Sequence, residues 1–319
     1  MSEQMHAAVL RGLGQVPRYE AFAVPAAGDG TAVVTATAAA LKLSDRLMAA
    51  GTHYAPVSFP AVAGLDGVGR LADGRRVAFF APVPPYGGMA EQVLVRDGVW
   101  FPVPDRTDDV TAAAVLNPGG AAWKVLMAEG GLAPGQRVLI LGATGTSGRI
   151  ASQLAVRHGA RVVVAGRNQA VLDDLVARGA DTAITVASPR SELAAAVAAA
   201  GPYDLIVDYL WGAPAEAVFQ ALQLGARPGA APTRYLLVGM TAGEVAALPA
   251  MTLRRAPVQL VGSGFGGPAS LADAATAFAH MLGLVASGEI ALDTEAVPLA
   301  EVTRAWEAPD HGRRIVFVP

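Results

Sequence analysis

A strand-like apolar run ends in a turn of three glycines near residue 142. Val138–Leu141 precede the turn, and a helical pattern continues from Ile150. The turn consists of Gly142, Ala143, Thr144, Gly145, Thr146, Ser147 and Gly148. Glycines let a backbone approach a pyrophosphate closely, and the first N–H groups of the following helix stabilise its charge. The GxxGxxG spacing therefore indicates a dinucleotide site, with a purely structural turn as the alternative.

A second apolar run, Arg161–Ala165, follows after one helix length, so the turn sits inside a βαβ unit. This run ends at Gly166, Arg167 and Asn168, where an NAD-preferring site places Asp or Glu on the ribose 2′-hydroxyl. The planar guanidinium of Arg167 suits a 2′-phosphate instead. We therefore predict NADPH as the cofactor; the alternative for Arg167 is a solvated side chain at a surface corner.

Strand-like and helical runs alternate from residue 118 to residue 264, which predicts a doubly wound parallel α/β sheet. The expected strands are Val138–Leu141, Val162–Ala165, Ala183–Val186, Leu205–Asp208, Tyr235–Gly239 and Val258–Val261. The expected helices are Ile150–Arg157, Ala170–Arg178, Glu192–Ala200 and Ala215–Leu224. Ligands of such sheets lie beyond the carboxyl ends of the strands. We therefore expect strand-end residues to line the cofactor cleft, namely Asp208, Gly239, Met240, Gly262, Ser263 and Gly264, although Asp208 could equally serve turn chemistry.

The first hundred residues contain short β runs separated by Pro and Gly clusters, which predicts a partly open β-barrel. These runs include Thr31–Ala36, Arg76–Phe80 and Gln92–Val95. A helical stretch, Ala269–Ala286, and a last strand, Arg314–Val318, then return to this domain. The expected domains are 1–117 with 265–319, and 118–264.

The composition of the chain argues against several classes of function. A formal charge of −3 over 319 residues argues against a nucleic-acid partner, and no apolar run approaches a membrane span. The N-terminus lacks the blocks of a signal peptide, so we expect a soluble cytoplasmic protein. With no cysteine and five scattered histidines, we expect no metal site, so the chemistry must come from a cofactor.

Three further segments carry a family resemblance: Ala55–Gly69 is similar to LPxxPGxExxGxV, Tyr86–Glu91 to GxxAEY, and Leu132–Leu139 to LxPGExVLV. Along its whole length the chain resembles the medium-chain dehydrogenase/reductase superfamily, and within it the zinc-free quinone oxidoreductase branch. This resemblance implies a Rossmann domain inserted into a GroES-like domain.

Zinc-dependent members carry Gly-His-Glu where this chain reads Gly64-Leu65-Asp66, and Leu65 cannot bind a metal. Without a Lewis acid, the alkoxide formed from a simple ketone has no metal to stabilise it. The resemblance therefore implies hydride transfer to a quinone or an α,β-unsaturated carbonyl, which spreads the charge by conjugation.

The resemblance also suggests substrate-site residues, each with an alternative. Lys42 stands where the branch commonly has the Asn of Asn-x-x-Asp; it could stabilise an oxyanion or point into solvent. Tyr54 matches a pocket tyrosine that could donate a proton or form an aromatic wall. Asn117–Ala121 occupies the segment that usually offers a hydroxyl to the nicotinamide, and Ala121 has none.

Two other functions remain open: an enoyl-thioester reductase, and an NADPH-binding sensor or structural protein without turnover. The edge run Val258–Val261 makes a homodimer plausible.

Overall fold

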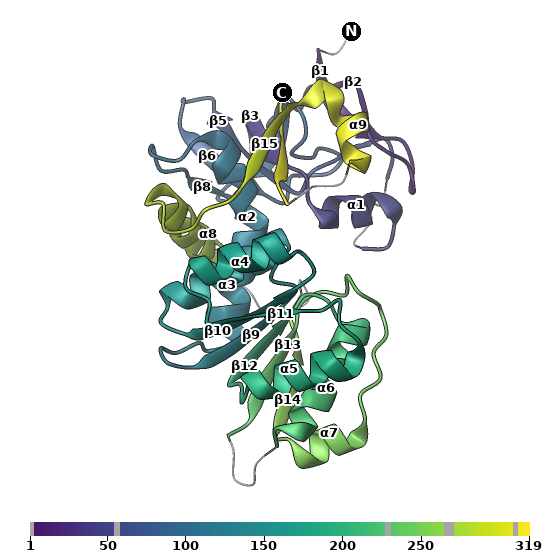
Figure 1. Ribbon diagram of the computed structural model, residues 1–319. Coiled ribbons are helices and arrows are strands. Elements are labelled where there is room, and N and C mark those ends of the chain that lie inside the picture. The colour runs from purple at the N-terminus through teal and green to yellow at the C-terminus, as the bar shows by residue number, and fades with distance from the viewer. Residues whose placement is uncertain (1–2, 54–57, 227–230, 265–270, 309–311) are drawn as a thin grey trace. The chain divides into compact units, whose positions relative to one another are not determined.

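The computed structural model describes the chain except for residues 1–2, 54–57, 227–230, 265–270 and 309–311 (Figure 1). The chain divides into two compact units, residues 1–120 with 270–319, and residues 121–269. The expected boundaries were 117/118 and 264/265.

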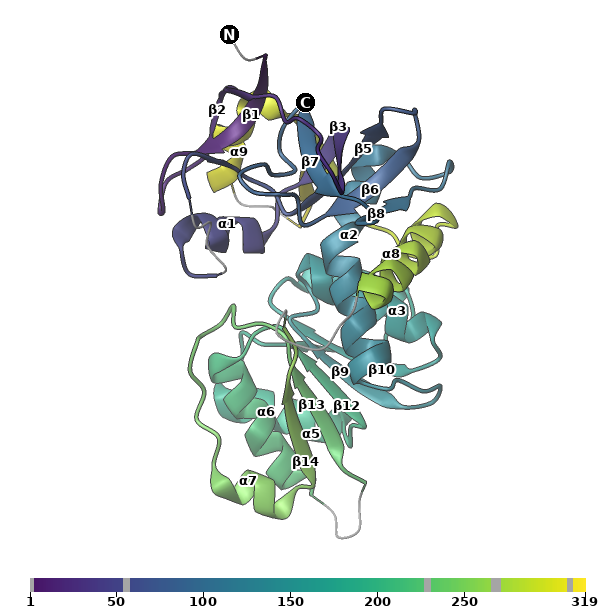
Figure 2. The same ribbon diagram turned by 180° about the vertical axis from the view of Figure 1, so that it is seen from behind.

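The second unit is built around one parallel sheet of six strands (Figure 2). The strands are β9 (Arg137–Leu141), β10 (Arg161–Gly166), β11 (Thr182–Thr185), β12 (Leu205–Asp208), β13 (Thr233–Leu237) and β14 (Val258–Gly262). Their order is β11-β10-β9-β12-β13-β14, the 3-2-1-4-5-6 order of a doubly wound nucleotide-binding sheet. The switch point, where the order reverses, lies between β9 and β12.

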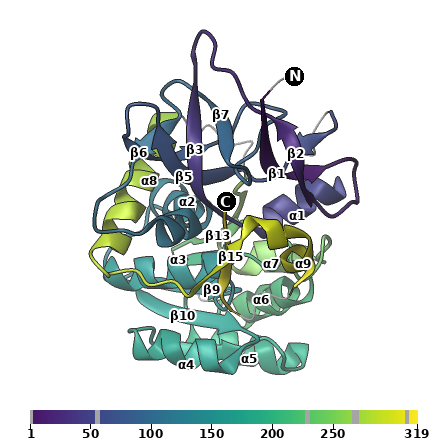
Figure 3. The same cartoon turned by 90° about the horizontal axis from the view of Figure 1, so that it is seen from above.

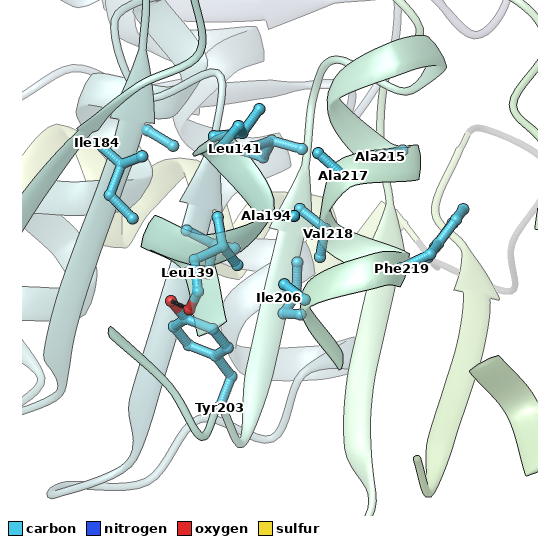
Figure 4. Packing of buried hydrophobic residues seen from close by; sticks show 14 of the residues in the cluster. Leu139, Leu141, Ile184, Ala194, Tyr203, Ile206, Ala215, Ala217, Val218 and Phe219 are labelled. Carbon is cyan, nitrogen blue, oxygen red and sulfur yellow. Dashed lines mark hydrogen bonds between the residues drawn. The ribbon is translucent and has the colours of Figure 1, made fainter. Parts of the chain in front are cut away.

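Helices cover both faces of this sheet. They are α3 (Thr146–Arg157), α4 (Gln169–Ala177), α5 (Arg190–Ala200), α6 (Gly212–Leu224) and α7 (Ala250–Arg255), and a π-helical segment, η1 (Lys124–Glu129), precedes β9. Alternate strand residues such as Leu139, Leu141 and Ile206 pack against α5 and α6, which contribute Ala194 and Phe219 (Figure 4). The strands are apolar on both faces because helices cover both, as parallel sheets require.

The first unit is β-rich (Figure 3). Its strands are β1 (Gln4–Leu10), β2 (Arg18–Ala23), β3 (Thr31–Ala40), β4 (Ala61–Val62), β5 (Asp66–Leu71), β6 (Arg76–Phe80), β7 (Gln92–Arg96), β8 (Trp100–Pro102), β15 (Thr294–Pro298) and β16 (Arg314–Val318). One sheet has the order β2-β1-β4 and the other the order β15-β16-β3-β5-β6-β8, with β7 also paired to β3. The strand expected at the C-terminal end is β16, which pairs antiparallel with β3. The fold class expected from the sequence is confirmed.

The helical elements that begin in this unit are α1 (Leu43–Ala50), α2 (Asp109–Trp123), α8 (Leu271–Ala286), η2 (Leu299–Glu301) and α9 (Val302–Glu307). Helix α2 was not foreseen, because Pro118 in its interior removes a backbone hydrogen bond and usually ends a helix. Gly119 and Gly120 explain its packing. A Cβ on Gly119 would lie 3.2 Å from Met281 Cγ, and a Cβ on Gly120 2.7 Å from the Phe278 ring.

Candidate functional site

The three glycines of the turn after β9 are each required for a different reason. Gly142 adopts φ +90°, which side chains rarely allow. A Cβ on Gly148 would lie 2.3 Å from the Gly142 carbonyl oxygen, so the third glycine lets α3 approach the strand end. A Cβ on Gly145 would meet only the Gly142 oxygen, at 3.6 Å. The protein therefore leaves open the place beside the second glycine, where a pyrophosphate would approach the backbone.

Backbone hydrogen bonds fix the shape of the turn. The amides of Gly142 and Ala143 both donate to the Ala165 carbonyl at the end of β10, at 2.8 and 2.9 Å. The Gly145 amide donates to the Gly142 carbonyl at 3.1 Å. The first two N–H groups therefore hold the turn on the sheet and the third closes the turn, so these groups are engaged within the protein.

The donors for an anion come from the start of α3. Gly145 is its N-cap, and the amide of Arg149 makes the first intrahelical bond, to Gly145 O at 2.8 Å. The amides of Thr146, Ser147 and Gly148 precede that bond, so helix geometry gives them no carbonyl one turn earlier. They lie at the positive end of the helix dipole, and the residues present fit a dinucleotide phosphate.

Three neighbouring residues at the end of β10, all predicted to bind the cofactor, have different surroundings in the structure. Gly166 makes room for the turn, because its Cβ would lie 2.3 Å from Thr144 Cγ2. Asn168 is the N-cap of α4, with its Oδ1 accepting from the Val171 amide at 3.3 Å. Arg167 and Asn168 are both exposed, but the Asn168 side chain is engaged as the cap, so Arg167 supplies the exposed cation that can meet a 2′-phosphate.

Asp208, expected in the cofactor cleft, is instead a fully buried carboxylate at the end of β12. Its Oδ1 accepts the amides of Leu210 (2.7 Å) and Trp211 (3.0 Å), and its Oδ2 accepts the Tyr235 hydroxyl at 2.6 Å. Burial raises the pKa of the Asp208 carboxyl, although these hydrogen bonds oppose the shift. Because the carboxylate is enclosed by its own loop, this geometry favours the turn-forming alternative over direct contact with the cofactor.

The other strand-end residues have mixed surroundings. A Cβ on Gly239 would lie 2.7 Å from the Tyr209 carbonyl, so Gly239 lets the ends of β12 and β13 approach. Met240 is 46% exposed. The Ser263 amide donates to Leu237 O at 2.7 Å, and the Gly264 carbonyl accepts from Lys124 Nζ at 2.7 Å.

Lys42, in the first unit, is buried in an ionic cluster rather than solvated, with 4% of its side chain exposed. Its ammonium lies 2.7 Å from Asp66 Oδ1, 2.9 Å from the Ala40 carbonyl and 3.3 Å from Asp45 Oδ2. Burial alone would lower the pKa of Lys42, but the two carboxylates outweigh it and raise it. The ammonium thus makes two hydrogen bonds and one ion pair within its own unit, which rules out the solvent-facing alternative and favours a structural role over contact with a substrate oxygen.

Asp45 extends this cluster. Its carboxylate accepts the amides of Lys42 at 2.8 Å and Leu65 at 3.2 Å, which ties the start of α1 to the residue before β5. The sequence analysis did not predict this cluster, although Asp66 could have indicated it, because a carboxylate in a buried strand needs a partner. Tyr235, the partner of Asp208, gave no such signal, because tyrosine is common in buried strands.

The remaining predicted residues lie elsewhere. Tyr54 falls outside the described residues. Asn117 is half-buried within α2, in the unit formed by residues 1–120 and 270–319. Among the residues that the structure describes, no cluster of three or more His, Asp or Glu could hold a metal ion. No helix in the described ranges is long and apolar enough to cross a membrane.

A doubly wound parallel sheet with a glycine turn at its switch point defines the class of Rossmann-type dinucleotide-binding proteins. No family model matches the chain. Among curated proteins, it is 28% identical over 236 residues to a probable NADPH-dependent quinone reductase, tdiC, of Emericella nidulans, covering 67% of this chain and 63% of that protein. It is 32% identical over 151 residues to prostaglandin reductase-3 of Bos taurus, covering 44% and 38%. The chain therefore spans less than two thirds of these relatives.

Solved structures match over the full length. A quinone oxidoreductase from Thermus thermophilus, described also in complex with NADPH, has a TM-score of 0.78 at 27% identity and covers 99% of this chain and 100% of its own. A probable oxidoreductase from Mycobacterium abscessus has a TM-score of 0.80 at 25% identity, with both chains covered completely. The resemblance to the medium-chain dehydrogenase/reductase superfamily, in its quinone oxidoreductase branch, is confirmed.

Proposed function

We propose that this protein is an NADPH-dependent oxidoreductase that reduces a quinone or an α,β-unsaturated carbonyl compound without zinc. The observation that carries the proposal is the turn after β9, whose open side lies at Gly145 beside the first amides of α3. The names of the relatives, an NADPH-dependent quinone reductase and a prostaglandin reductase among them, support the same class of activity.

Arg167 supports NADPH over NADH. It is exposed at the end of β10, beside the turn, and its guanidinium can form two parallel bonds to a 2′-phosphate. A ribose 2′-hydroxyl would offer it no charge.

Bound NADPH supplies the hydride. The chain would hold its pyrophosphate at Thr146, Ser147 and Gly148, and Leu65 leaves the family's zinc position without a ligand side chain. A conjugated acceptor suits such a site, because it spreads the negative charge that a metal would otherwise stabilise. Tyr54 stays our proposed proton donor to the substrate oxygen, whereas Lys42 is engaged by Asp45 and Asp66.

The test is consumption of NADPH, with NADH in parallel, against quinones and enones of graded size, with the products identified. Turnover with a preference for NADPH is the expected result. Turnover with enoyl thioesters alone would replace the substrate class. Tight NADPH binding without consumption of any acceptor would overturn the enzyme assignment in favour of a sensor.

A homodimer and a cytoplasmic location belong to the same proposal. Strand β14 is an edge strand of its sheet, and Leu260 on it is 39% exposed. Exposed edges pair readily with a second chain. Light scattering should give twice the chain mass, and Leu260→Lys should give the monomer mass; a monomeric wild-type protein would rule the dimer out.

A further inference from the structure

The buried pair of Asp208 and Tyr235 joins three segments at the carboxyl edge of the parallel sheet. Tyr235 is fully buried on β13, and its hydroxyl donates to Asp208 Oδ2 at 2.6 Å. The other carboxylate oxygen accepts the Leu210 and Trp211 amides. A fully buried carboxylate with both oxygens bonded has no exposed atom for a ligand, so its effect must pass through the loop it holds.

That loop has an unusual backbone. Trp211 has φ +56° and ψ −156°, a conformation that side-chain-bearing residues rarely adopt. The Trp211 amide donates to Asp208 Oδ1, and its ring packs edge-on against the Tyr235 ring at 6.4 Å. The pair therefore holds Trp211 by both its backbone and its side chain.

The loop in turn lies against the glycine turn. The Tyr209 amide donates to Leu141 O at 3.0 Å. A Cβ on Gly142 would lie 3.1 Å from Tyr209 Cβ and from Leu210 Cδ2. A shift of Tyr209 or Leu210 would therefore reach the first glycine of the dinucleotide turn directly.

The segment after β13 is attached to the same centre. The amides of Val238 and Gly239 donate to the Asp208 carbonyl at 2.8 and 3.1 Å, and the Ala242 amide donates to Leu210 O at 2.8 Å. Asp208 thus connects the ends of β9, β12 and β13, which border the switch point where ligands of this sheet type bind.

From these contacts we propose that Asp208 and Tyr235 are positioning residues that set the cofactor-binding edge of the sheet without touching the cofactor. The inference rests on the proposed function for its ligand, NADPH. On this inference, the buried pair fixes the positions of the three backbone segments that would surround the dinucleotide.

The chain offers a matched control in Tyr203, another buried tyrosine of the same unit. Its hydroxyl donates to Val197 O at 2.8 Å. Tyr203 precedes β12 in the chain, so this bond lies at the amino end of the strand, opposite to Asp208. Tyr235→Phe and Tyr203→Phe each remove one buried hydroxyl bond. A general loss of stability would affect both variants, whereas a positioning role would separate them.

The experiment uses four variants: Tyr235→Phe, Tyr203→Phe, Asp208→Asn and Asp208→Ala. For each it measures the NADPH dissociation constant, the melting temperature and the amide hydrogen exchange of the unliganded protein. Tyr235→Phe should weaken NADPH binding about three- to tenfold, and Tyr203→Phe less than about twofold. Asp208→Ala should weaken binding more than about tenfold. Asp208→Asn should recover most of the affinity, because its amide oxygen can still accept both backbone N–H groups.

Exchange at residues 209–212 and 238–242 should accelerate in Tyr235→Phe and not in Tyr203→Phe. Unchanged affinity in Tyr235→Phe would overturn the inference, and so would equal losses in the two tyrosine variants. If the wild-type protein binds no nicotinamide cofactor, the proposed function fails, and the exchange pattern still decides the positioning role. Equal exchange in all variants would then refute it.

Discussion

Buried charge at the ends of strands is the residue-scale feature that most changes the functional interpretation. Asp208 and Lys42 both looked like groups that could touch a ligand, and both are enclosed by partners from their own unit. Arg167 is the opposite case, since its side chain is exposed where a phosphate could reach it. The side chains that contact ligand should therefore be exposed ones, with the buried charges holding the backbone around them.

Replacing Arg167 with Gln should raise the KM for NADPH about tenfold or more and leave the KM for NADH nearly unchanged. A hydrogen bond to a charged group contributes about 1.5–3 kcal/mol, and NADH lacks the 2′-phosphate. Steady-state kinetics with both cofactors checks this. Arg178→Gln, at the other end of α4, is the control and should change neither constant. An unaltered preference in Arg167→Gln would remove the phosphate assignment.

Replacing Lys42 with Met should destabilise the protein by about 3–5 kcal/mol, because it leaves Asp45 and Asp66 buried without their cation. Urea unfolding measures the loss. The control is Arg304→Met, which removes an exposed ion pair with Glu301 and should leave the melting temperature unchanged. A stable Lys42→Met protein with lost turnover would restore the catalytic role that the geometry argues against.

At the scale of elements, the turn between β9 and α3 contains one glycine that the packing requires, Gly148, and one beside which a ligand has room, Gly145. Gly148 packs against the Gly142 carbonyl, while the space beside Gly145 is open. Gly145 has φ −81° and ψ 163°, which alanine can adopt. Gly145 is the extended N-cap and Gly148 lies within α3, so neither needs glycine for its backbone angles, and what lies beside each one separates them.

Gly145→Ala should therefore keep the wild-type melting temperature and lose most NADPH affinity, since its methyl group would occupy the space for the pyrophosphate. Gly148→Ala should lower stability by about 1–3 kcal/mol, because its Cβ has no room beside the backbone. Calorimetry and NADPH titration of both variants check the contrast. Normal NADPH binding by a folded Gly145→Ala protein would contradict the site.

At the scale of the whole molecule, the buried hydroxyl of Tyr235 makes the free energy of unfolding depend on pH. Burial and the Asp208 carboxylate raise the pKa of Tyr235 well above its ordinary value of 10.0. A raised folded-state pKa means that the folded protein holds the proton more tightly than the unfolded chain. This stabilisation is complete below the unfolded value and declines as pH rises through the folded one.

The free energy of unfolding should therefore fall as pH rises above about 10, and Tyr235→Phe should fall less steeply because it has no proton to lose. Urea unfolding at pH 8 and at pH 10.5 measures both slopes. The stability difference between wild type and Tyr235→Phe should shrink at the higher pH. A constant difference would show that Tyr235 does not titrate with folding.

The sequence by itself determined the features that depend on neighbours along the chain. Strand β12 has the expected bounds, Leu205–Asp208, and the turn follows β9 as predicted. The reason is physical: an apolar strand, a glycine turn and a helix start are local patterns of backbone preference and side-chain periodicity.

Only the tertiary structure decided the partners of the buried polar groups. Asp66 lies 24 residues from Lys42, and Tyr235 lies 27 residues from Asp208. Helix α2 continues through Pro118 because packing outweighs local preference. A buried charge must be paired wherever the fold brings a partner, and the spacing along the chain does not say which residue that will be.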